Sequence, residues 1–222
     1  MGTPSRQLDE PPRYIAIEGP IGVGKTTLAQ RVATSLRYPT LLEPSAENPF
    51  LDRFYRERGR NALPTQLYFL LHRVRQLADL AHGELFATNV VSDFLLAKDR
   101  LFAELTLDAD ELAVYQQIYD KLAVTPPVPD LVVYLQAPTN VLHERIRRRG
   151  VPAEQYIASE YLDSLIDAYT RFFHYYDEAP LLIVNAAEID FANNDEHFHE
   201  LLARIVGMNG ARQYFNPNPT LI

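Results

Sequence analysis

The stretch Gly19-Pro20-Ile21-Gly22-Val23-Gly24-Lys25-Thr26 decides the fold, because it matches the pattern G-x-x-x-x-G-K-[ST]. An apolar run at 14–17 precedes it, and a helix-like pattern begins at Lys25. The glycines let the backbone curl until its N–H groups point at phosphate oxygens, and the following helix presents the positive end of its dipole to the same anion. An ordinary glycine turn would not need a strand before it and a helix after it. The stretch therefore predicts a phosphate-binding loop for a nucleoside triphosphate.

The polar residues of this loop have expected roles. Lys25 would reach the β- and γ-phosphates, and the hydroxyl of Thr26 would be a ligand of Mg²⁺. The sequence thus predicts ATP as the phosphate donor and Mg²⁺ as its cofactor. The predicted ATP-binding residues are Gly19, Pro20, Ile21, Gly22, Val23, Gly24, Lys25, Thr26 and Thr27.

The composition favours one domain that binds small molecules. With 222 residues, of which 47% are hydrophobic, the chain can bury one good core but is short for two. The net charge of −8 argues against a nucleic-acid polymer as the partner, because such binding needs clustered Lys and Arg. The lack of cysteine excludes disulfides and thiolate metal sites. Residues 1–12 are polar and no 18 apolar residues run together, so we expect a cytoplasmic protein without a membrane partner.

Five short apolar runs predict the strands of a parallel sheet. They lie at 14–17, 40–42, 90–92, 131–135 and 181–184, and each is continuous rather than alternating. Such runs suit strands that are buried on both faces, with helices as the covering layers. The predicted helices lie at 25–36, 49–58, 64–82, 98–105, 110–122, 139–149, 159–176 and 195–206. We therefore expect an α/β fold with a five-stranded parallel sheet in a single domain over 1–222, with irregular tails at 1–12 and 209–222.

In an open parallel sheet the ligand site lies beyond the carboxyl ends of the strands, so the residues that follow each run are candidates. Glu43 follows the second run and is made rigid by Pro44, and its carboxylate would accept a proton from a hydroxyl near the γ-phosphate. Asp93 follows the third run, where a carboxylate beside a phosphate-binding loop holds Mg²⁺. A capping or solvated Glu43 and a simple turn at Asp93 are the alternatives.

An arginine-rich turn ends the predicted helix 139–149. Arg145 and Arg149 are four residues apart and share one helix face, with Arg148 beside them. Crowded like charges need an anion to absorb their repulsion, and a transferring phosphoryl group beneath a mobile flap is such an anion. The turn thus predicts an arginine-rich lid, with a basic solvated face as the alternative.

Gln66 and Arg73 form a polar pair on the predicted helix 64–82. They are seven residues apart, hence on one face, and the residues between them are mostly apolar. Such a pair needs buried polar partners, and the edge of a nucleobase would serve. An amphipathic helix with a wet side is the alternative.

The joint order and spacing of these features resemble the deoxyribonucleoside kinases, most closely the bacterial kinases of deoxyadenosine and deoxyguanosine. The resemblance extends from Tyr14 to about Phe191 and implies the fold of a P-loop kinase. Besides the phosphate-binding loop, the residues that carry it are Glu43-Pro44, Tyr55, Gln66, Arg73, Lys98-Asp99-Arg100-Leu101-Phe102-Ala103, Pro129-Asp130-Leu131-Val132-Val133-Tyr134-Leu135, Glu144-Arg145-Ile146-Arg147-Arg148-Arg149-Gly150 and Glu160-Tyr161-Leu162.

The resemblance implies transfer of the γ-phosphate of ATP to the 5′-hydroxyl of a deoxyribonucleoside, with deoxyadenosine preferred and deoxyguanosine and deoxycytidine behind it. It also implies a homodimer. The expected catalytic residues are Glu43, Lys25, Arg145 and Arg149; the expected substrate-binding residues are Glu43, Tyr55, Gln66, Arg73, Asp99 and Glu154; the expected metal ligands are Thr26 and Asp93.

Among the residues that the resemblance places at the substrate, three would read the base and two would hold the sugar. Gln66, Arg73 and Asp99 would pair with the polar groups of the base edge. Tyr55 and Glu154 would hold the 3′-hydroxyl. Glu43 would be the general base at the 5′-hydroxyl.

The chain departs from the family pattern at two places. Many relatives carry an acid-arginine-serine triplet after the third strand, where this chain has Asp93-Phe94-Leu95, so the arginine expected at the 5′-oxygen is absent. In the lid, Val151 and Ala153 stand where Arg and Glu are frequent. Arg147 or Arg148 would compensate there.

Two other functions fit part of the pattern. A nucleoside monophosphate kinase, for example a thymidylate kinase-like enzyme, shares the fold and the flap, but Glu43 and Glu154 would repel its anionic acceptor. A non-catalytic ATP-binding regulator would keep the phosphate-binding loop but would not need Glu43 together with the lid arginines. A guanine-nucleotide switch is disfavoured, because no Asn-Lys-x-Asp run occurs. The sequence therefore favours a kinase of uncharged nucleosides.

Overall fold

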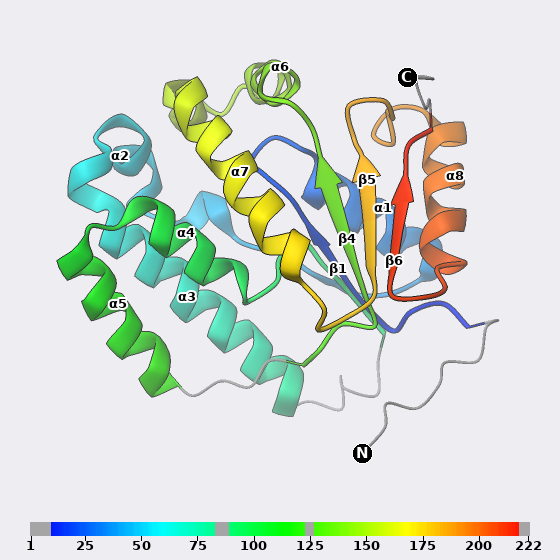
Figure 1. Ribbon diagram of the computed structural model, residues 1–222, viewed down its shortest axis with the longest axis horizontal. Helices are drawn as coiled ribbons and strands as arrows, with labels where there is room; N and C mark the ends of the chain where they lie inside the picture. Colours follow the sequence, from blue (N-terminus) through cyan, green and yellow to red (C-terminus); the bar gives the residue numbers. More distant parts are fainter. Residues whose placement is uncertain (1–9, 83–88, 123–126, 218–222) are drawn as a thin grey trace.

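The computed structural model describes residues 10–82, 89–122 and 127–217, and these residues form a parallel sheet between two helical layers (Figure 1). Within them, six parallel strands lie in the order β2-β3-β1-β4-β5-β6. The strands are β1 Tyr14–Glu18, β2 Thr40–Leu41, β3 Val90–Ser92, β4 Leu131–Gln136, β5 Leu181–Asn185 and β6 Arg212–Phe215. The predicted α/β class is confirmed.

The helices connect successive strands and cover both faces of the sheet. They are α1 Lys25–Leu36, α2 Leu51–Arg56, α3 Arg58–His82, α4 Lys98–Thr106, α5 Ala109–Leu122, α6 Thr139–Arg149, α7 Ser159–Tyr175 and α8 Asp195–Val206. In Figure 1, α1 and α8 lie on the opposite side of the sheet from α7, and α6 lies beyond the carboxyl ends of the strands. Short 3-10 turns occur at Ser45–Glu47 and Pro152–Tyr156.

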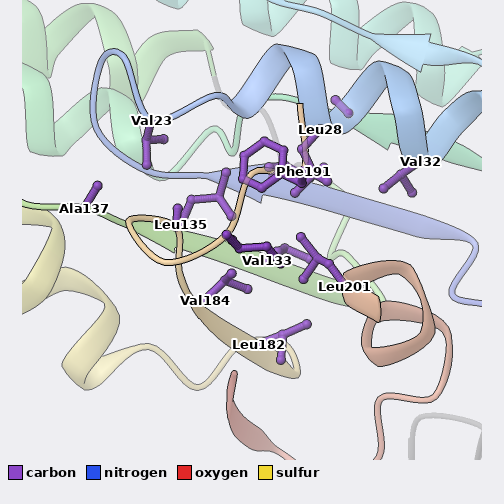
Figure 2. Close-up of a cluster of buried hydrophobic side chains, with 14 of the residues drawn as sticks. Val23, Leu28, Val32, Val133, Leu135, Ala137, Leu182, Val184, Phe191 and Leu201 are labelled. Atoms are coloured by element: carbon purple, nitrogen blue, oxygen red, sulfur yellow. The ribbon is translucent and has the colours of Figure 1, made fainter. Parts of the chain in front are cut away.

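Alternate side chains of the central strands pack on opposite faces, which explains the continuous apolar runs. Ile15 and Ile17 belong to the cluster that includes side chains of α1 and α8. Figure 2 shows part of this cluster, with Leu28 of α1 and Leu201 of α8 labelled. Tyr14 and Ala16 pack with α3, α4, α5 and α7 on the other face. Because β1 has a helical layer on each side, no position along it can be polar without a buried partner. Glu18, at its end, is the residue where that partner is needed.

The sixth strand corrects the predicted five-stranded sheet and the predicted irregular tail at 209–222. Residues 212–215 of that tail pair in parallel with β5 as the edge strand β6. An edge strand has one strand neighbour and an exposed side, so the side chains of Arg-Gln-Tyr-Phe alternate between exposed and more buried positions, and the sequence does not give a continuous apolar run. The predicted tail at 1–12 lies mostly outside the described residues, as do residues 218–222.

Two side chains hold β6 on the domain. Phe215 is buried in the cluster that includes α8, with 5% of its surface exposed. Arg212 donates hydrogen bonds to the carbonyl oxygens of Phe173 (3.0 Å), His174 (3.2 Å) and Tyr176 (2.8 Å) at the end of α7. These carbonyls have no partner within their own helix, so the guanidinium caps α7 as it anchors the strand.

The helix predicted at 64–82 begins earlier, at Arg58, with Pro64 inside it. The helix predicted at 49–58 is correspondingly shorter and covers Leu51–Arg56. Pro64 is accommodated because it lies in the second turn of the longer helix, close to its beginning, where few intrahelical hydrogen bonds are lost. The shift does not move Gln66 and Arg73 off their shared helix.

We predict that β6 contributes to stability through Phe215. The Phe215→Ala variant is expected to lower the free energy of unfolding by about 3 kcal/mol, because it leaves a cavity beside α8. The neighbouring Tyr214 is 73% exposed, and Tyr214→Ala is expected to change the same quantity by less than about 0.5 kcal/mol. Urea titration followed by circular dichroism measures both variants, and equal effects would show that β6 is not packed as described.

Candidate active site

The phosphate-binding loop joins β1 to α1 with three glycines in conformations that other residues rarely adopt. Gly19 has φ +147°, and a Cβ there would lie 2.5 Å from the carbonyl oxygen of Leu135. Gly24, with φ +105°, is the N-cap of α1 and gives that helix no side-chain cap. The first N–H groups of α1 are therefore available to an anion, as the sequence predicted. The ammonium of Lys25 donates to the carbonyl oxygens of Gly19 (2.8 Å) and Pro20 (3.3 Å).

Thr26 and Asp93 meet at the carboxyl ends of β1 and β3. The Thr26 hydroxyl donates to Oδ2 of Asp93 at 2.5 Å, and Oδ1 of Asp93 accepts from the backbone N–H of Glu43 at 2.8 Å. A hydroxyl beside a carboxylate is an oxygen donor set that suits Mg²⁺, which keeps most of its other ligands as water and substrate phosphate. Among the described residues there is no group of three or more His, Asp or Glu side chains that could hold a metal ion.

A cavity of about 700 Å³ extends from this loop over α6 and the segment that follows β5. It holds the predicted residues Gly22, Val23, Gly24, Lys25, Thr26, Thr27, Arg145 and Arg149. It also contains residues 187–192, which the sequence reasoning missed. These residues follow the fifth strand directly, so the rule applied to the ends of the first four strands would have found them. The size and lining of this cavity fit the phosphate donor.

The two predicted lid arginines differ in what they contact. Arg145 donates from Nη1 to the carbonyl oxygen of Val23 (3.1 Å) and from Nη2 to that of Ala186 (2.7 Å). It therefore ties α6 to the phosphate-binding loop and to the end of β5. Burial lowers its pKa, and the nearby Arg148 adds to this effect. Arg149 instead forms an ion pair with Glu154 through Nε (2.9 Å) and Nη2.

A second, smaller cavity brings together five of the six predicted substrate residues; the sixth, Asp99, is fully buried outside the lining and contacts Arg73. The cavity has Glu43, Tyr55, Gln66, Arg73 and Glu154 in its lining. Its volume is about 100 Å³, whereas ligand pockets usually measure roughly 300–1,000 Å³. The side chains of Glu43 and Arg73 join across it, and the ion pair of Arg149 with Glu154 lies at its wall. A nucleoside would therefore have to separate these pairs as it enters.

The two cavities are adjacent. They share Gly22, Lys25, Thr26 and Arg149 in their linings. A γ-phosphate held by Lys25 would consequently lie between a ligand in the larger cavity and one in the smaller cavity. This is the arrangement that direct transfer between two bound molecules requires.

Arg73 binds two carboxylates at once. Its Nε donates to Oε1 of Glu43 at 2.6 Å and its Nη2 also contacts Glu43, while its Nη1 contacts Oδ1 of Asp99. Burial alone would raise the pKa of Glu43, but the charges of Arg73 and Lys98 outweigh it and lower that pKa to about 2. At Asp99 burial prevails over Arg73 and raises the pKa to about 6. Glu43 therefore stays ionised throughout the neutral range.

The groups expected to read a base are oriented for hydrogen bonding. Within the described part of the chain, Oδ2 of the fully buried Asp99 has no hydrogen-bond partner. Gln66 is buried and donates from Nε2 to the hydroxyl of Thr106 at 3.1 Å. An unsatisfied buried carboxylate oxygen is costly unless a ligand donates to it. An N–H group of a nucleobase would be such a donor.

Two buried charged residues near Glu43 were not among the predicted site residues. Glu18, at the end of β1, accepts hydrogen bonds from the backbone N–H groups of Gly19 (3.1 Å) and Leu95 (2.6 Å) and from the hydroxyl of Tyr169 (3.0 Å). The ammonium of Lys98 lies 3.5 Å from Glu18 and 3.6 Å from Glu43. A charge within an apolar strand pattern was the signal at Glu18. Lys98 directly precedes the predicted substrate residue Asp99, but the sequence pattern around it did not indicate which way the Lys98 side chain points.

A parallel sheet with a phosphate-binding loop, a carboxylate-hydroxyl pair for a metal and an arginine-bearing helix defines a P-loop phosphotransferase with a separate acceptor cavity. Residues 15–208 match the deoxynucleoside kinase family. The chain belongs to that family, and it is an ATP-dependent kinase of deoxynucleosides.

Individual relatives agree with this assignment. The chain is 35% identical over 197 residues to the deoxyguanosine kinase of Bacillus subtilis, covering 86% of this chain and 95% of that protein. It is 26% identical over 207 residues to the deoxyadenosine kinase of Lactobacillus acidophilus, covering 87% and 94%. The structure of deoxyadenosine kinase from M. mycoides, with products dCMP and a flexible dCDP bound, has a TM-score of 0.76 at 27% identity, covering 88% of this chain and 100% of that one.

None of the helices within the described residues is both long enough and apolar enough to cross a bilayer.

Lys25 provides a prediction about pH. Burial lowers its pKa to about 8, and the neighbouring charge of Lys98 contributes. Because Lys25 loses its charge as the pH rises through that value, the affinity for a non-hydrolysable ATP analogue is expected to fall by about tenfold between pH 7 and pH 9. Isothermal titration calorimetry measures this profile. A Lys25→Arg control, whose guanidinium stays charged, is expected to lack the fall, and parallel profiles for the two proteins would contradict the assignment.

Proposed function

We propose that this kinase transfers the γ-phosphate of ATP to the 5′-hydroxyl of a purine deoxyribonucleoside in nucleotide salvage, with deoxyguanosine preferred over deoxyadenosine. The sequence prediction put deoxyadenosine first. The 35% identity to a deoxyguanosine kinase, against 26% to a deoxyadenosine kinase, favours the reverse order. The observation that carries the proposal is the acceptor cavity, where Glu43 lies beside the residues expected to read a base.

An uncharged acceptor suits this cavity better than a nucleoside monophosphate. Glu43 and Glu154 both line it, and both carboxylates would repel a phosphate group. Arg73 is shared between the carboxylates of Glu43 and Asp99, so its charge is already balanced and would not offset that repulsion. No feature of the described residues favours a monophosphate kinase or a non-catalytic regulator over a kinase of uncharged deoxynucleosides.

The donor side supplies charge and position. In this proposal the backbone of residues 19–24 and the ammonium of Lys25 hold the ATP phosphates, and Thr26 and Asp93 hold Mg²⁺. When bound, Mg²⁺ would neutralise charge on the phosphate oxygens. Arg145 would keep α6 close to the loop through its carbonyl contacts. Arg149, released from Glu154 by the incoming nucleoside, would contact the transferring phosphoryl group.

The acceptor side orients the hydroxyl. The Glu43 carboxylate would accept a hydrogen bond from the 5′-hydroxyl and then its proton. With a pKa of about 2, Glu43 accepts a proton only weakly in the ligand-free protein. A nucleoside whose nucleobase draws Arg73 away from Glu43 would raise that pKa, because the charge of Arg73 is one cause of the low value. Phosphoryl transfer with a loose transition state also needs little proton removal before the phosphoryl group moves.

Base and sugar would be held by the remaining residues. Asp99, through its unpaired Oδ2, and Arg73 would contact the polar edge of the base, and the Gln66 amide would pair with adjacent atoms of that edge. Tyr55 and Glu154, which line the same cavity, would hold the 3′-hydroxyl. The homodimer and the cytoplasmic location remain predictions.

The expected substrate order can be measured directly. Initial rates with ATP and Mg²⁺ are determined for the four deoxynucleosides, the ribonucleosides and the deoxynucleoside monophosphates. We expect kcat/KM to be highest for deoxyguanosine and next for deoxyadenosine, with no diphosphate formed from any monophosphate. Diphosphate formed from monophosphates alone would contradict the proposal, and a pyrimidine deoxynucleoside as the best acceptor would contradict the purine preference.

The Glu43→Gln variant tests the proposed base. Because an amide cannot take the proton, kcat is expected to fall by about 100-fold or more, while the dissociation constant for ATP changes little. Steady-state rates and calorimetric titration give the two quantities. Glu47→Gln is the matched control, since Glu47 is exposed in the neighbouring turn, and it should behave like the wild type. Equal kcat values for Glu43→Gln and the wild type would remove Glu43 from the mechanism.

A further inference from the structure

Lys98 is a charged side chain at a place where burial is costly. It begins α4, and its side chain is only 3% exposed. Its ammonium lies between two carboxylates, 3.5 Å from Oε1 of Glu18 and 3.6 Å from Oε1 of Glu43. A buried ammonium is tolerated when short hydrogen bonds replace its lost water. Both distances exceed the ~2.7–2.9 Å of a charge-assisted hydrogen bond, so that replacement is incomplete.

The two carboxylates do not depend on Lys98 for their hydrogen bonds. Glu18 already accepts from Gly19, Leu95 and Tyr169. Glu43 is held by two nitrogens of Arg73. A purely structural ion pair would be expected to show closer contact. The N–H groups of the Lys98 ammonium therefore remain available to donate a hydrogen bond to another acceptor.

The other positively charged side chains that line the acceptor cavity already donate close hydrogen bonds within the protein. The lining contains Lys25, Arg73, Lys98 and Arg149. Lys25 donates to carbonyl oxygens of the phosphate-binding loop, Arg73 to Glu43 and Asp99, and Arg149 to Glu154. Lys98 is the member of this set whose contacts are both long, and it lies beside the carboxylate that would accept the proton of the 5′-hydroxyl.

The loop after β3 does not provide another cation at this point. Phe94 follows Asp93 and is fully buried, with its ring 6.0 Å from the guanidinium of Arg73. Leu95 and Leu96 follow and are also buried. Lys98, one turn later, is the first basic side chain that this segment presents to the cavity.

We propose that Lys98 is a catalytic residue whose ammonium donates a hydrogen bond to the 5′-oxygen of the acceptor, next to Glu43. This inference rests on the proposed function. As the bond from the 5′-oxygen to the γ-phosphorus forms, the bond from that phosphorus to the β,γ-bridging oxygen breaks, and ADP leaves with its electron pair. The hydroxyl proton passes to Glu43. Lys98 stays protonated: its hydrogen bond positions the 5′-oxygen in line with the γ-phosphorus, and its charge stabilises the negative charge spread over the transferring phosphoryl group.

The test uses the full chain and the deoxynucleoside that the wild type phosphorylates best. Lys98→Met is expected to lower kcat by about 100- to 1,000-fold, the usual cost of removing one transition-state donor, with the dissociation constant for ATP within about twofold of the wild type. Lys98→Arg, which keeps a charged donor, should recover at least about tenfold of that loss. Lys121→Met is the matched control, because Lys121 is exposed at the end of α5.

A double variant separates catalysis from charge compensation. If Lys98→Met folds poorly because Glu18 is left unpaired, Glu18→Gln with Lys98→Met removes both charges and should fold. Catalysis by Lys98 predicts that this double variant is at least about 100-fold slower than Glu18→Gln alone. An active Glu18→Gln variant that is no faster than the double variant, or a kcat for Lys98→Met within about threefold of the wild type, would overturn the inference.

Failure of the proposed function would look different. A wild-type protein that phosphorylates no deoxynucleoside would contradict the function itself. An active wild type with an unaffected Lys98→Met variant would contradict only the role of Lys98.

Discussion

The hydrogen bonds to Glu18 are the constraint on which the site depends. One carboxylate, buried at the end of β1, accepts from the start of the phosphate-binding loop, from the segment after β3 and from α7. Those segments carry Lys25, Asp93 and Lys98, so a single buried charge fixes the positions of the phosphate-binding loop, the carboxylate paired with Thr26 and the cation beside Glu43. Burying such a charge is costly, and its three donors together with Lys98 offset that cost. The hydrogen bonds of Glu18 thus hold the segments that follow β1 and β3 in fixed positions relative to each other.

In the ligand-free protein the charged side chains around the acceptor cavity form ion pairs with one another. Arg73 binds Glu43 and Asp99, and Arg149 binds Glu154. The space left is too small for a nucleoside. A substrate that hydrogen-bonds Asp99 and displaces Arg149 would therefore assemble the site as it binds, and a smaller molecule such as water would not. Coupling of this kind would protect ATP from hydrolysis when no acceptor is present.

The sequence predicted the parts of the molecule whose patterns are local. The phosphate-binding loop and the central strands follow from glycine spacing and apolar runs, and the structure has them where expected; Asp93 directly follows β3, beside Thr26. Strand β6 was missed because an edge strand does not show a buried run. The contacts of Arg145 with carbonyl oxygens of Val23 and Ala186, and of Arg73 with two carboxylates, join residues far apart in the chain. The spacing of residues along one helix predicts which face of the helix a side chain lies on, but not which distant residue it contacts.

The central claim is that the two cavities are the donor and acceptor halves of one site, joined at Lys25 and Arg149. The most direct test is calorimetric titration with a bisubstrate analogue in which a polyphosphate links adenosine to deoxyguanosine. We expect one analogue to bind per chain, and prior saturation with either ATP or deoxyguanosine to weaken its binding. Two analogues bound per chain, or binding weakened by ATP and unaffected by deoxyguanosine, would contradict a shared site.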